Sequence, residues 1–556
     1  MFRLLCLCWL LTWSLSAHAD ERPNIILLFS DDMGWSDIGC YGSEIQTPHL
    51  DALAENGLRF SQFYNFARCC PSRACLMSGL YPHQAGMGHM EGDYGLDAYR
   101  GGINRRCVTL AEVLGANGYS TYMTGKWHLT RFRDKAGPKD NWPRQRGFQR
   151  FYGTITGAGS FFDPTTLCRE NTYITPENDE AYQPQQFYYT DAITDNAIEF
   201  LKAHQQENPQ QPYFLYVAYT TAHWPMHALQ RDIDKYQGQY ASGFEQTREK
   251  RMQRLRELGI LDQDSLESPI FGDWDRVENK DWEARLMEVY AAMIDNMDQN
   301  IGKLIAEVKR QKDFDNTLFL YLQDNGGCAE GMGRQPAKKE LVDLKPLGRD
   351  GLQKKIWPPM QTRDGRPVRV GPQTMAGAED TYIGYGKGWA NVSNTPFREY
   401  KHWVHEGGIS SPLIAHWPKG ITARGWNHEV AHLIDIMPTL VDVAGASYPD
   451  RFHDTEIPAM EGVSLRPAFN AKSLQRKGPI FWEHEGNRAV RFASADGDWK
   501  LVGKHKKPWE LYNMSQDRVE SNNLAAKEPE RVAAMAELWQ AWADRVGCVE
   551  FGSWKK

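Results

Sequence analysis

The sequence lacks an excess of basic residues. Its 556 residues include 64 Lys and Arg against 71 Asp and Glu, which gives a formal net charge of −7. Proteins that capture nucleic acid electrostatically present a basic face to the phosphates. The charge balance therefore argues against a nucleic-acid partner.

Long apolar runs are also missing, except at the N-terminus. There Arg3 precedes the apolar run Leu4–Leu15, and Ala17–Ala19 has the small-x-small pattern of a cleavage site. This arrangement is typical of a signal peptide. We therefore expect residues 1–19 to be removed, the mature chain to start at Asp20, and the protein to be periplasmic or secreted, with no membrane span in the mature chain.

Cysteine is scarce for a protein that we expect to be exported. The sequence has ten cysteines, of which Cys6 and Cys8 fall in the expected signal peptide. Eight cysteines in so long a chain are too few for a disulfide-based scaffold, and their spacing does not reveal any pairing. With 41% hydrophobic residues, the composition is that of a globular protein with an ordinary core.

Three short apolar segments each run directly into polar residues: Asn24–Phe29 into Ser30–Asp32, Tyr213–Tyr219 into Thr220–His223, and Thr317–Leu322 into Gln323–Gly327. This pattern is typical of buried parallel strands whose carboxyl ends open on a site. Helical patterns lie between them, at Thr109–Asn117, Asp191–His204 and Trp282–Gln311. The alternation predicts an α/β fold with a large doubly wound sheet flanked by helices.

Three less regular regions interrupt this alternation: Ala228–Asp281, Cys328–Tyr400 and Gly445–Gly478. Long loops in a compact domain often form lids or rims, so we interpret the first two as walls of a substrate pocket. The third indicates a division between a large domain over residues 20–445 and a smaller α+β domain over 446–556. In the smaller domain we expect three short strands and a terminal helix, at Ala489–Phe492, Trp499–Val502, Glu510–Tyr512 and Pro529–Val546.

The segment Cys69–Gly79, CCPSRACLMSG, carries the most specific motif. It matches C-x-P-S-R-x-x-x-[LM]-[ST]-G, and here the chain resembles the type I sulfatases of the alkaline-phosphatase superfamily, in particular the arylsulfatases. The resemblance implies that a separate formylglycine-generating enzyme, or another sulfatase-maturing enzyme, oxidises Cys69 to Cα-formylglycine, whose hydrate is the nucleophile. Cys70 and Cys75 do not fit the register. The resemblance also implies an alkaline-phosphatase-like mixed sheet.

Further segments along most of the chain are similar to the same family. They are Thr47–Ala54 with Gly57–Phe60, Gly125–Leu129, Ala222–Pro225, Asp324–Gly327, Asn394–Lys401, Trp509–Asn513 and Asn522–Leu524. One departure is Thr130, which stands where the family usually has Gly. This departure puts the turn that follows in doubt, but not the chemistry of the preceding Lys and His.

Four oxygen donors lie at the ends of two predicted strands: Asp31, Asp32, Asp324 and Asn325. Oxygen-only ligation favours Ca²⁺ or Mg²⁺ over Zn²⁺. By resemblance the cofactor is one calcium ion, with magnesium as the alternative, and Cys69 in its modified form joins the ligands. Taken separately, these residues could simply cap a turn. Beside the Cys69 motif, the metal site is the favoured interpretation.

The resemblance also supplies roles for the cationic residues and the histidines. Arg73 would support the hydrated aldehyde and offset the ligand carboxylates. Lys126 and Lys401 would stabilise charge on the sulfate oxygens. His223 or Lys401 could protonate the leaving oxygen, and His128 would remove a proton from the diol.

The sequence thus predicts a sulfuric ester hydrolase that releases sulfate and an alcohol or phenol. Its substrate would be an aryl sulfate or a sulfated glycan. Two alternatives stay open: a phosphonate monoester or phosphodiester hydrolase of the same superfamily, and a non-catalytic protein that binds sulfated glycans.

Overall fold

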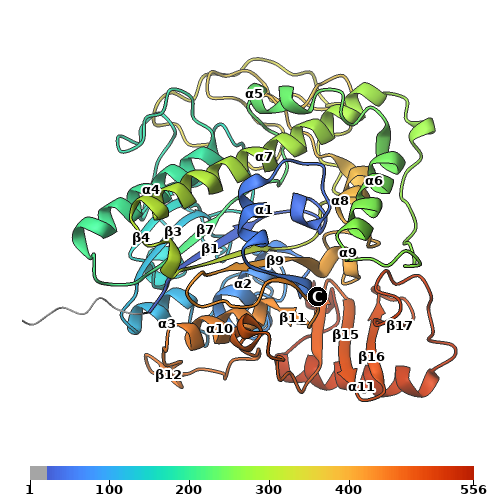
Figure 1. Cartoon of the computed structure of the whole chain (residues 1–556). Helices are drawn as coiled ribbons and strands as arrows, with labels where there is room; N and C mark the ends of the chain where they lie inside the picture. Colours follow the sequence, from blue (N-terminus) through green and yellow to red (C-terminus); the bar gives the residue numbers. More distant parts are fainter. Residues whose placement is uncertain (1–21, 556) are drawn as a thin grey trace, which may run out of the picture.

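The structure is a computed structural model that describes residues 22–555 (Figure 1). The expected signal peptide and the expected start at Asp20 lie outside these residues. Within the described part, no helix is long and apolar enough to cross a membrane. The eight cysteines of the described part are all free, so no disulfide contributes to the fold there.

A mixed sheet of eleven strands forms the centre of the molecule (Figure 1). In spatial order its strands are β10 (Gly425–Asn427), β2 (Leu58–Tyr64), β9 (Ser410–His416), β8 (Thr317–Gln323), β1 (Asn24–Ser30), β7 (Tyr213–Ala218), β3 (Ser120–Lys126), β4 (Arg150–Thr154), β5 (Leu167–Arg169) and β6 (Thr172–Tyr173), and β11 (Ala431–His432) also pairs with β2. The three predicted strands β1, β7 and β8 are adjacent and parallel, whereas β9 runs antiparallel to both its neighbours. The carboxyl ends of β8, β1, β7 and β3 therefore meet at one edge of the sheet.

Helices cover both faces of this sheet. Successive side chains of a strand point to opposite faces, and in β1 Ile25, Leu27 and Phe29 join one core while Ile26 and Leu28 join the other. The first core includes α2 (Cys69–Ser78), α3 (Leu110–Ala116) and α10 (Ile436–Val443), and the second includes α1 (Pro48–Glu55), α4 (Tyr189–Glu207) and α7 (Lys280–Arg310). The predicted doubly wound α/β architecture is confirmed.

Local sequence explains where the predicted helices begin. Thr109 caps α3 in a reciprocal pair with Glu112: the Glu112 amide donates to Thr109 Oγ1 at 3.1 Å, and the Thr109 amide donates to Glu112 Oε2 at 2.7 Å. Asn279 caps α7 by accepting a hydrogen bond from the Trp282 amide at 3.1 Å. Short 3₁₀ helices lie at Gly39–Tyr41, Pro143–Arg146, Asp234–Tyr236, Trp274–Arg276, Phe314–Asn316, Leu433–Asp435, Arg466–Asn470 and Ser553–Lys555.

The region Ala228–Asp281 is more regular than its sequence predicts. It contains α5 (Gln230–Ile233) and α6 (Gly243–Glu257), and α6 packs against α8 (Gly386–Ser393). The buried face of α6 includes Arg251. Its Nη1 lies 2.7 Å from Asp37 Oδ1, and its Nη2 lies 2.9 Å from Glu44 Oε1. A helix whose buried face carries arginines shows no apolar period, which explains why the sequence pattern missed it.

The C-terminal part forms a small antiparallel sheet on a helix, as predicted. Its strands are β14 (Ile480–His484), β15 (Asn487–Ser494), β16 (Gly497–Gly503) and β17 (Glu510–Asn513), and α11 (Pro529–Val546) packs on β15 and β16. A two-stranded pair, β12 (Arg451–Phe452) with β13 (Thr455–Glu456), precedes it. Trp482 and Trp542 belong to the same core as α2. The domain boundary near residue 445 stays a prediction, because the core is continuous across it.

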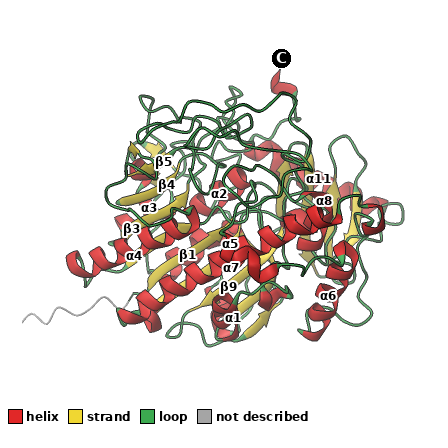
Figure 2. Cartoon of the chain, turned by 90° about the horizontal axis from the view of Figure 1, so that it is seen from above, coloured by secondary structure: helices red, strands yellow, loops and turns green. Residues whose placement is uncertain are grey.

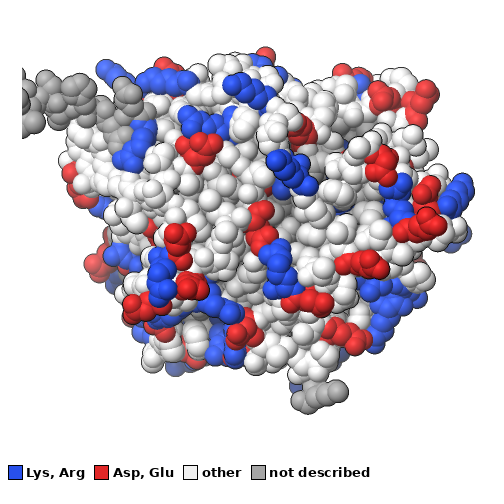
Figure 3. Space-filling view, turned by 90° about the horizontal axis from the view of Figure 1, so that it is seen from below, with Lys and Arg blue, Asp and Glu red and all other residues white. Residues whose placement is uncertain are grey.

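Loops gather on one side of the molecule around α2, as Figure 2 shows. On the face that Figure 3 shows, acidic and basic side chains are interspersed.

Candidate active site

The candidate site lies where the parallel strands end. Asp31 and Asp32 follow β1, Asp324 and Asn325 follow β8, and His223 lies five residues after β7. Because these strands are parallel neighbours, segments far apart in the sequence meet at one edge.

Four oxygen-bearing side chains form a fully buried group at this edge: Asp31, Asp32, Asp324 and Asn325. The Asp32 amide donates to Asp324 Oδ1 at 3.2 Å, and Asn325 Nδ2 donates to Asp32 Oδ1 at 2.8 Å. Among the described atoms, Oδ1 of Asp31 and Oδ1 of Asn325 are buried without a hydrogen-bond partner. Buried oxygens are rarely left unpaired, and three carboxylates with an amide suit a hard divalent cation. The residues present therefore fit a divalent metal.

The electrostatics of the acids agree with this fit. Burial, followed by the charge of Asp324, raises the pKa of Asp31 to about 7, although Lys126 acts in the opposite direction. Burial also raises the pKa of Asp324. Burial opposes ionisation of Asp32 as well, but Lys401 and His223 bring the pKa of Asp32 below its ordinary value. A bound cation would offset the remaining repulsion.

Each carboxylate is paired with a buried cation. Lys126 Nζ donates to Asp31, and Arg73 Nη2 lies 3.0 Å from Asp324 Oδ2 and 3.4 Å from Asp31 Oδ2. Lys401 Nζ lies 2.7 Å from Asp32 Oδ1. The structure thus brings together Arg73, Lys126 and Lys401, although Arg73 and Lys401 are 328 residues apart in the sequence (401 − 73).

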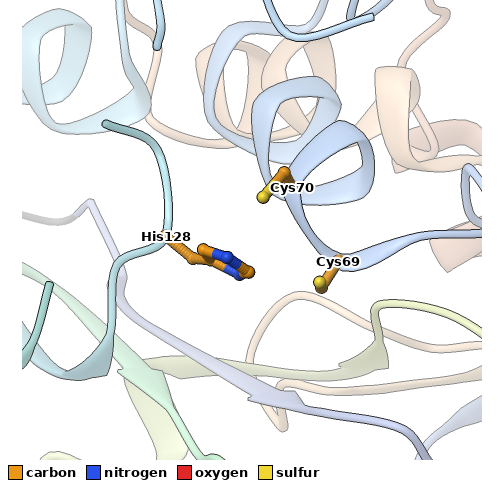
Figure 4. A group of neighbouring side chains, drawn as sticks. All are labelled: Cys69, Cys70 and His128. Atoms are coloured by element: carbon orange, nitrogen blue, oxygen red, sulfur yellow. The ribbon is translucent and has the colours of Figure 1, made fainter. Parts of the chain in front are cut away.

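The predicted nucleophile begins a helix. Cys69 is the first residue of α2, where the amino-terminal field of the helix favours negative charge. The sulfur atoms of Cys69 and Cys70 and a ring nitrogen of His128 lie within 4.8 Å of one another, and Figure 4 shows the His128 ring directed toward the two cysteines from a facing loop. The hydrogen bond from Cys70, with the charges of Lys126 and His128, holds the pKa of the Cys69 thiol well below its usual range, although burial opposes this.

His128 has an acidic partner that the sequence did not reveal. Its Nε2 lies 3.7 Å from Glu91 Oε2, which is also 3.2 Å from Arg133 Nη1. Burial lowers the pKa of His128, but Cys69 and Glu91 outweigh burial, so the pKa is raised. Glu91 lies in a loop without a recognisable motif, and only the tertiary structure brings it to the site.

His223 faces the acid group through one nitrogen. Its Nδ1 lies 2.7 Å from the Trp224 carbonyl, and this acceptor requires Nδ1 to carry the proton. Nε2 lies 3.5 Å from Asp32 Oδ2 and 3.5 Å from Lys401 Nζ. Burial lowers the pKa of His223. The neutral ring therefore presents a lone pair toward Lys401.

A further acid missing from the predicted set is Glu330. It lies 2.8 Å from Arg68 Nη1 and accepts a hydrogen bond of 2.8 Å from Trp224 Nε1. Its position three residues beyond the Asp324–Gly327 motif is a signal that could have suggested it. Glu330 thus connects Arg68, the residue before Cys69, with Trp224, the residue after His223, through an ion pair and a hydrogen bond.

Comparisons with known proteins identify the family. The sulfatase family model matches residues 23–446, and a model for the C-terminal part of N-sulphoglucosamine sulphohydrolase matches residues 398–545. The chain is 34% identical to an arylsulfatase of Klebsiella aerogenes over 84% of its own length and 96% of the relative's. It is 31% identical to an uncharacterized sulfatase of Schizosaccharomyces pombe, over 95% of each chain.

A solved structure shares the fold over nearly the whole length. The crystal structure of Ps i-CgsB superposes with a TM-score of 0.63 at 23% identity, and the match covers 94% of this chain and 93% of that one. The family match, which spans most of the chain, agrees with the resemblance inferred from the Cys69 motif. The chain belongs to the sulfatase family, and it is an enzyme that hydrolyses sulfate esters.

Proposed function

We propose that this sulfatase cleaves sulfate monoesters with residue 69 as its nucleophile, after a separate maturation enzyme has oxidised Cys69 to Cα-formylglycine. The observation that carries the proposal is the position of Cys69. It lies at the start of α2, beside His128, and it interacts with Lys126 at the edge of the buried oxygen donors. A structural cysteine would not need this set of charged neighbours.

Asp31, Asp32, Asp324 and Asn325 would hold one divalent metal ion, which we propose to be calcium, with magnesium as the alternative. The unpaired oxygens of Asp31 and Asn325 support this assignment. The ion would polarise a sulfate oxygen and help to orient residue 69. Arg73 holds Asp31 and Asp324 in place through its two contacts to them.

The hydrated aldehyde of residue 69 would offer two hydroxyl groups. The oxygen of one forms a bond to sulfur while the bond between sulfur and the leaving oxygen breaks, and the proton that this hydroxyl loses balances the one that the leaving oxygen takes up. Loss of the proton from the other hydroxyl then restores the aldehyde while the bond between the carbon and the sulfate oxygen breaks, which releases sulfate. We propose that His128 takes that proton, and the direction of its ring toward residue 69 supports this role (Figure 4).

Lys126 and Lys401 would stabilise the charge that develops on the sulfate oxygens. Both are buried, so their charges act with little screening by water. Of the two candidates, His223 and Lys401, we propose that Lys401 protonates the leaving oxygen, because the neutral ring of His223 carries its proton on Nδ1 and none on Nε2. Their 3.5 Å separation lets one support the other in this step.

A sulfated glycan is our proposal for the natural substrate. One solved structure with this fold holds its substrate D-glucosamine-2-N,6-O-disulfate, and another holds k-i-k-neocarrahexaose. We also propose that the protein is exported after removal of residues 1–19 and that a smaller domain begins near residue 446.

The test combines peptide mass spectrometry with turnover. In protein from its own host, the peptide containing residue 69 should have the mass of formylglycine. Turnover of 4-nitrophenyl sulfate should depend on added calcium and should disappear in Cys69→Ala. The matched control is Cys75→Ala, which removes a buried cysteine one to two turns along the same helix and should keep measurable activity. An unmodified thiol in active enzyme would contradict the proposal.

A further inference from the structure

A cleft with a volume of 810 Å³ opens beside the candidate active site. Its lining includes two loops that contribute Arg133, Lys135, Lys354, Lys355 and Trp357. We call it the basic cleft. Residues 352–359 belong to the irregular region Cys328–Tyr400, so this part of the predicted pocket wall does line a cleft.

The basic cleft borders the site on the side of His128. Arg133 Nη1 lies 3.2 Å from Glu91, which contacts His128, and donates to Thr156 Oγ1 at 3.1 Å. Gly157, the next residue, lies so close to His128 that an added Cβ would be 2.0 Å from its ring. The wall of the basic cleft is therefore directly adjacent to His128, the proposed base.

It also borders the site on the side of His223. The Trp357 and Trp224 rings lie 4.7 Å apart, and the Trp224 and His223 rings lie 4.2 Å apart. Trp357 is 45% exposed, which is high for so large an apolar side chain. A ligand in the cleft would contact its free face.

The charge of the cleft is strongly positive. Four cationic side chains line it, against one acid, Asp134. Among the residues that the structure describes, no ion pair involves Lys135, Lys354 or Lys355, in contrast to nearby Arg131, which pairs with Asp93. The backbone of this wall is anchored, since Thr165 Oγ1 donates to the Lys355 carbonyl at 3.0 Å. Lys354 and Lys355 therefore lie on a loop whose backbone is fixed by a hydrogen bond, and neither charge is neutralised by an ion pair with another described residue.

We propose that the basic cleft binds a second anionic group, a sulfate or a carboxylate, on the sugar part of an oligosaccharide substrate. Ammonium groups bind such anions, and an exposed indole stacks on the apolar face of a sugar ring. A volume of 810 Å³ is within the range of ligand sites and much larger than one sulfate needs. The inference rests on the proposed function, because it places the scissile ester beside residue 69.

The test removes charge from the cleft in Lys354→Gln/Lys355→Gln. The matched control is Lys202→Gln/Lys303→Gln, which removes two exposed lysines. These lysines lie toward the carboxyl ends of α4 and α7. The first helix leads into the start of β7 and the second into the start of β8. The control lysines therefore lie near the amino ends of these strands, whereas the site lies at their carboxyl ends. Binding is measured by calorimetry in a Cys69→Ala background, so that it does not depend on turnover.

The probes are a heparin tetrasaccharide, a carrageenan tetrasaccharide, and the desulfated heparin tetrasaccharide, which keeps its carboxylates. The cleft variant should bind at least one sulfated probe about tenfold more weakly, as expected for two lost exposed ion pairs, and the control should change affinity less than twofold. If the desulfated probe shows the same dependence on the lysines, the group is a carboxylate. If the affinity for the desulfated probe does not depend on the two lysines, the group is a sulfate.

Turnover of 4-nitrophenyl sulfate by the enzyme with Cys69 intact completes the test. Its kcat/KM should change less than twofold in the cleft variant, because this ester has no second anion. The inference would be overturned if the parent and the cleft variant bound the probes equally, or if no probe bound at all. It would also be overturned if the cleft variant lost aryl sulfate turnover by the same factor as its affinity for the probes. Absence of all sulfatase activity in the parent would refute the proposed function, while the binding measurements would still decide about the cleft.

Discussion

Single residues at the site were predictable by type but not by pairing. The motifs named Asp31, Asp32 and Lys401, yet only the structure shows that Lys401 pairs with Asp32 while Lys126 pairs with Asp31. Each pairing crosses between strands or loops far apart in the sequence. Motif spacing contains no information about such contacts.

Gly157 provides a prediction at this scale. In Gly157→Ala the new Cβ would lie 2.0 Å from His128 Cε1, so the ring must leave its present position beside residue 69. We expect kcat to fall about 100-fold or more, as for loss of a general base, while the fold is retained. Steady-state kinetics with an aryl sulfate and thermal unfolding measure the two effects.

Gly115→Ala is the matched control for that substitution. Gly115 lies within α3, and an added Cβ would meet only Thr121 Cγ2 at 3.7 Å, an ordinary contact. This variant should keep full kcat and gain about 0.5 kcal/mol of stability. Full activity in Gly157→Ala would show that His128 need not be held where the structure places it.

At the scale of elements, periodicity succeeded where each element buries apolar residues. The strands β1, β7 and β8 and the helices α3, α7 and α11 lie within a few residues of their predicted bounds. It failed for α6, whose buried face includes Arg248 and Arg251. Local pattern cannot show that an arginine will be buried, because its partners Asp37 and Glu44 lie about 200 residues away.

The turn before α10 yields a pH prediction. His432 Nδ1 accepts a hydrogen bond from the Ile434 amide at 3.2 Å, and burial lowers the pKa of His432 to about 3. The unfolded chain takes up a proton near pH 6.5, but the folded chain does not. As the pH falls from 7 to 5, this histidine alone should therefore cost about 2 kcal/mol of stability.

The variant His432→Asn isolates this effect, because Asn can cap the turn but cannot be protonated. We expect it to be less stable than the parent at pH 7, and the difference should shrink by about 2 kcal/mol at pH 5. Urea unfolding at the two pH values measures both differences. A constant difference would mean that His432 is not kept neutral in the folded protein.

For the whole molecule, a buried ionic cluster joins the C-terminal sheet to the short helix that precedes β9 of the eleven-stranded sheet. Lys500 of β16 lies 2.9 Å from Glu406, which begins α9 (Glu406–Ile409), and 2.8 Å from Glu520. All three side chains are fully buried. Burial opposes the charge of Glu406, but Lys500 and Arg518 keep the pKa of Glu406 below its ordinary value.

Lys500→Met should therefore destabilise the protein by about 3 kcal/mol or more, because two carboxylates lose a buried partner. The control Lys527→Met alters an exposed lysine of the same C-terminal part and should change stability by less than about 0.5 kcal/mol. Urea unfolding monitored by tryptophan fluorescence compares them. Similar stabilities for both variants would show that the cluster does not hold the two sheets together.

The sequence alone determined the family, the strand-helix alternation and the residue types of the site, because motifs and burial periodicity are local properties of the chain. The tertiary structure decided which cation pairs with which carboxylate, that Glu91 and Glu330 join the site, and that unpaired lysines gather in the basic cleft. These features depend on contacts between distant segments. Such contacts exist only once the parallel strands align their carboxyl ends at one edge of the sheet.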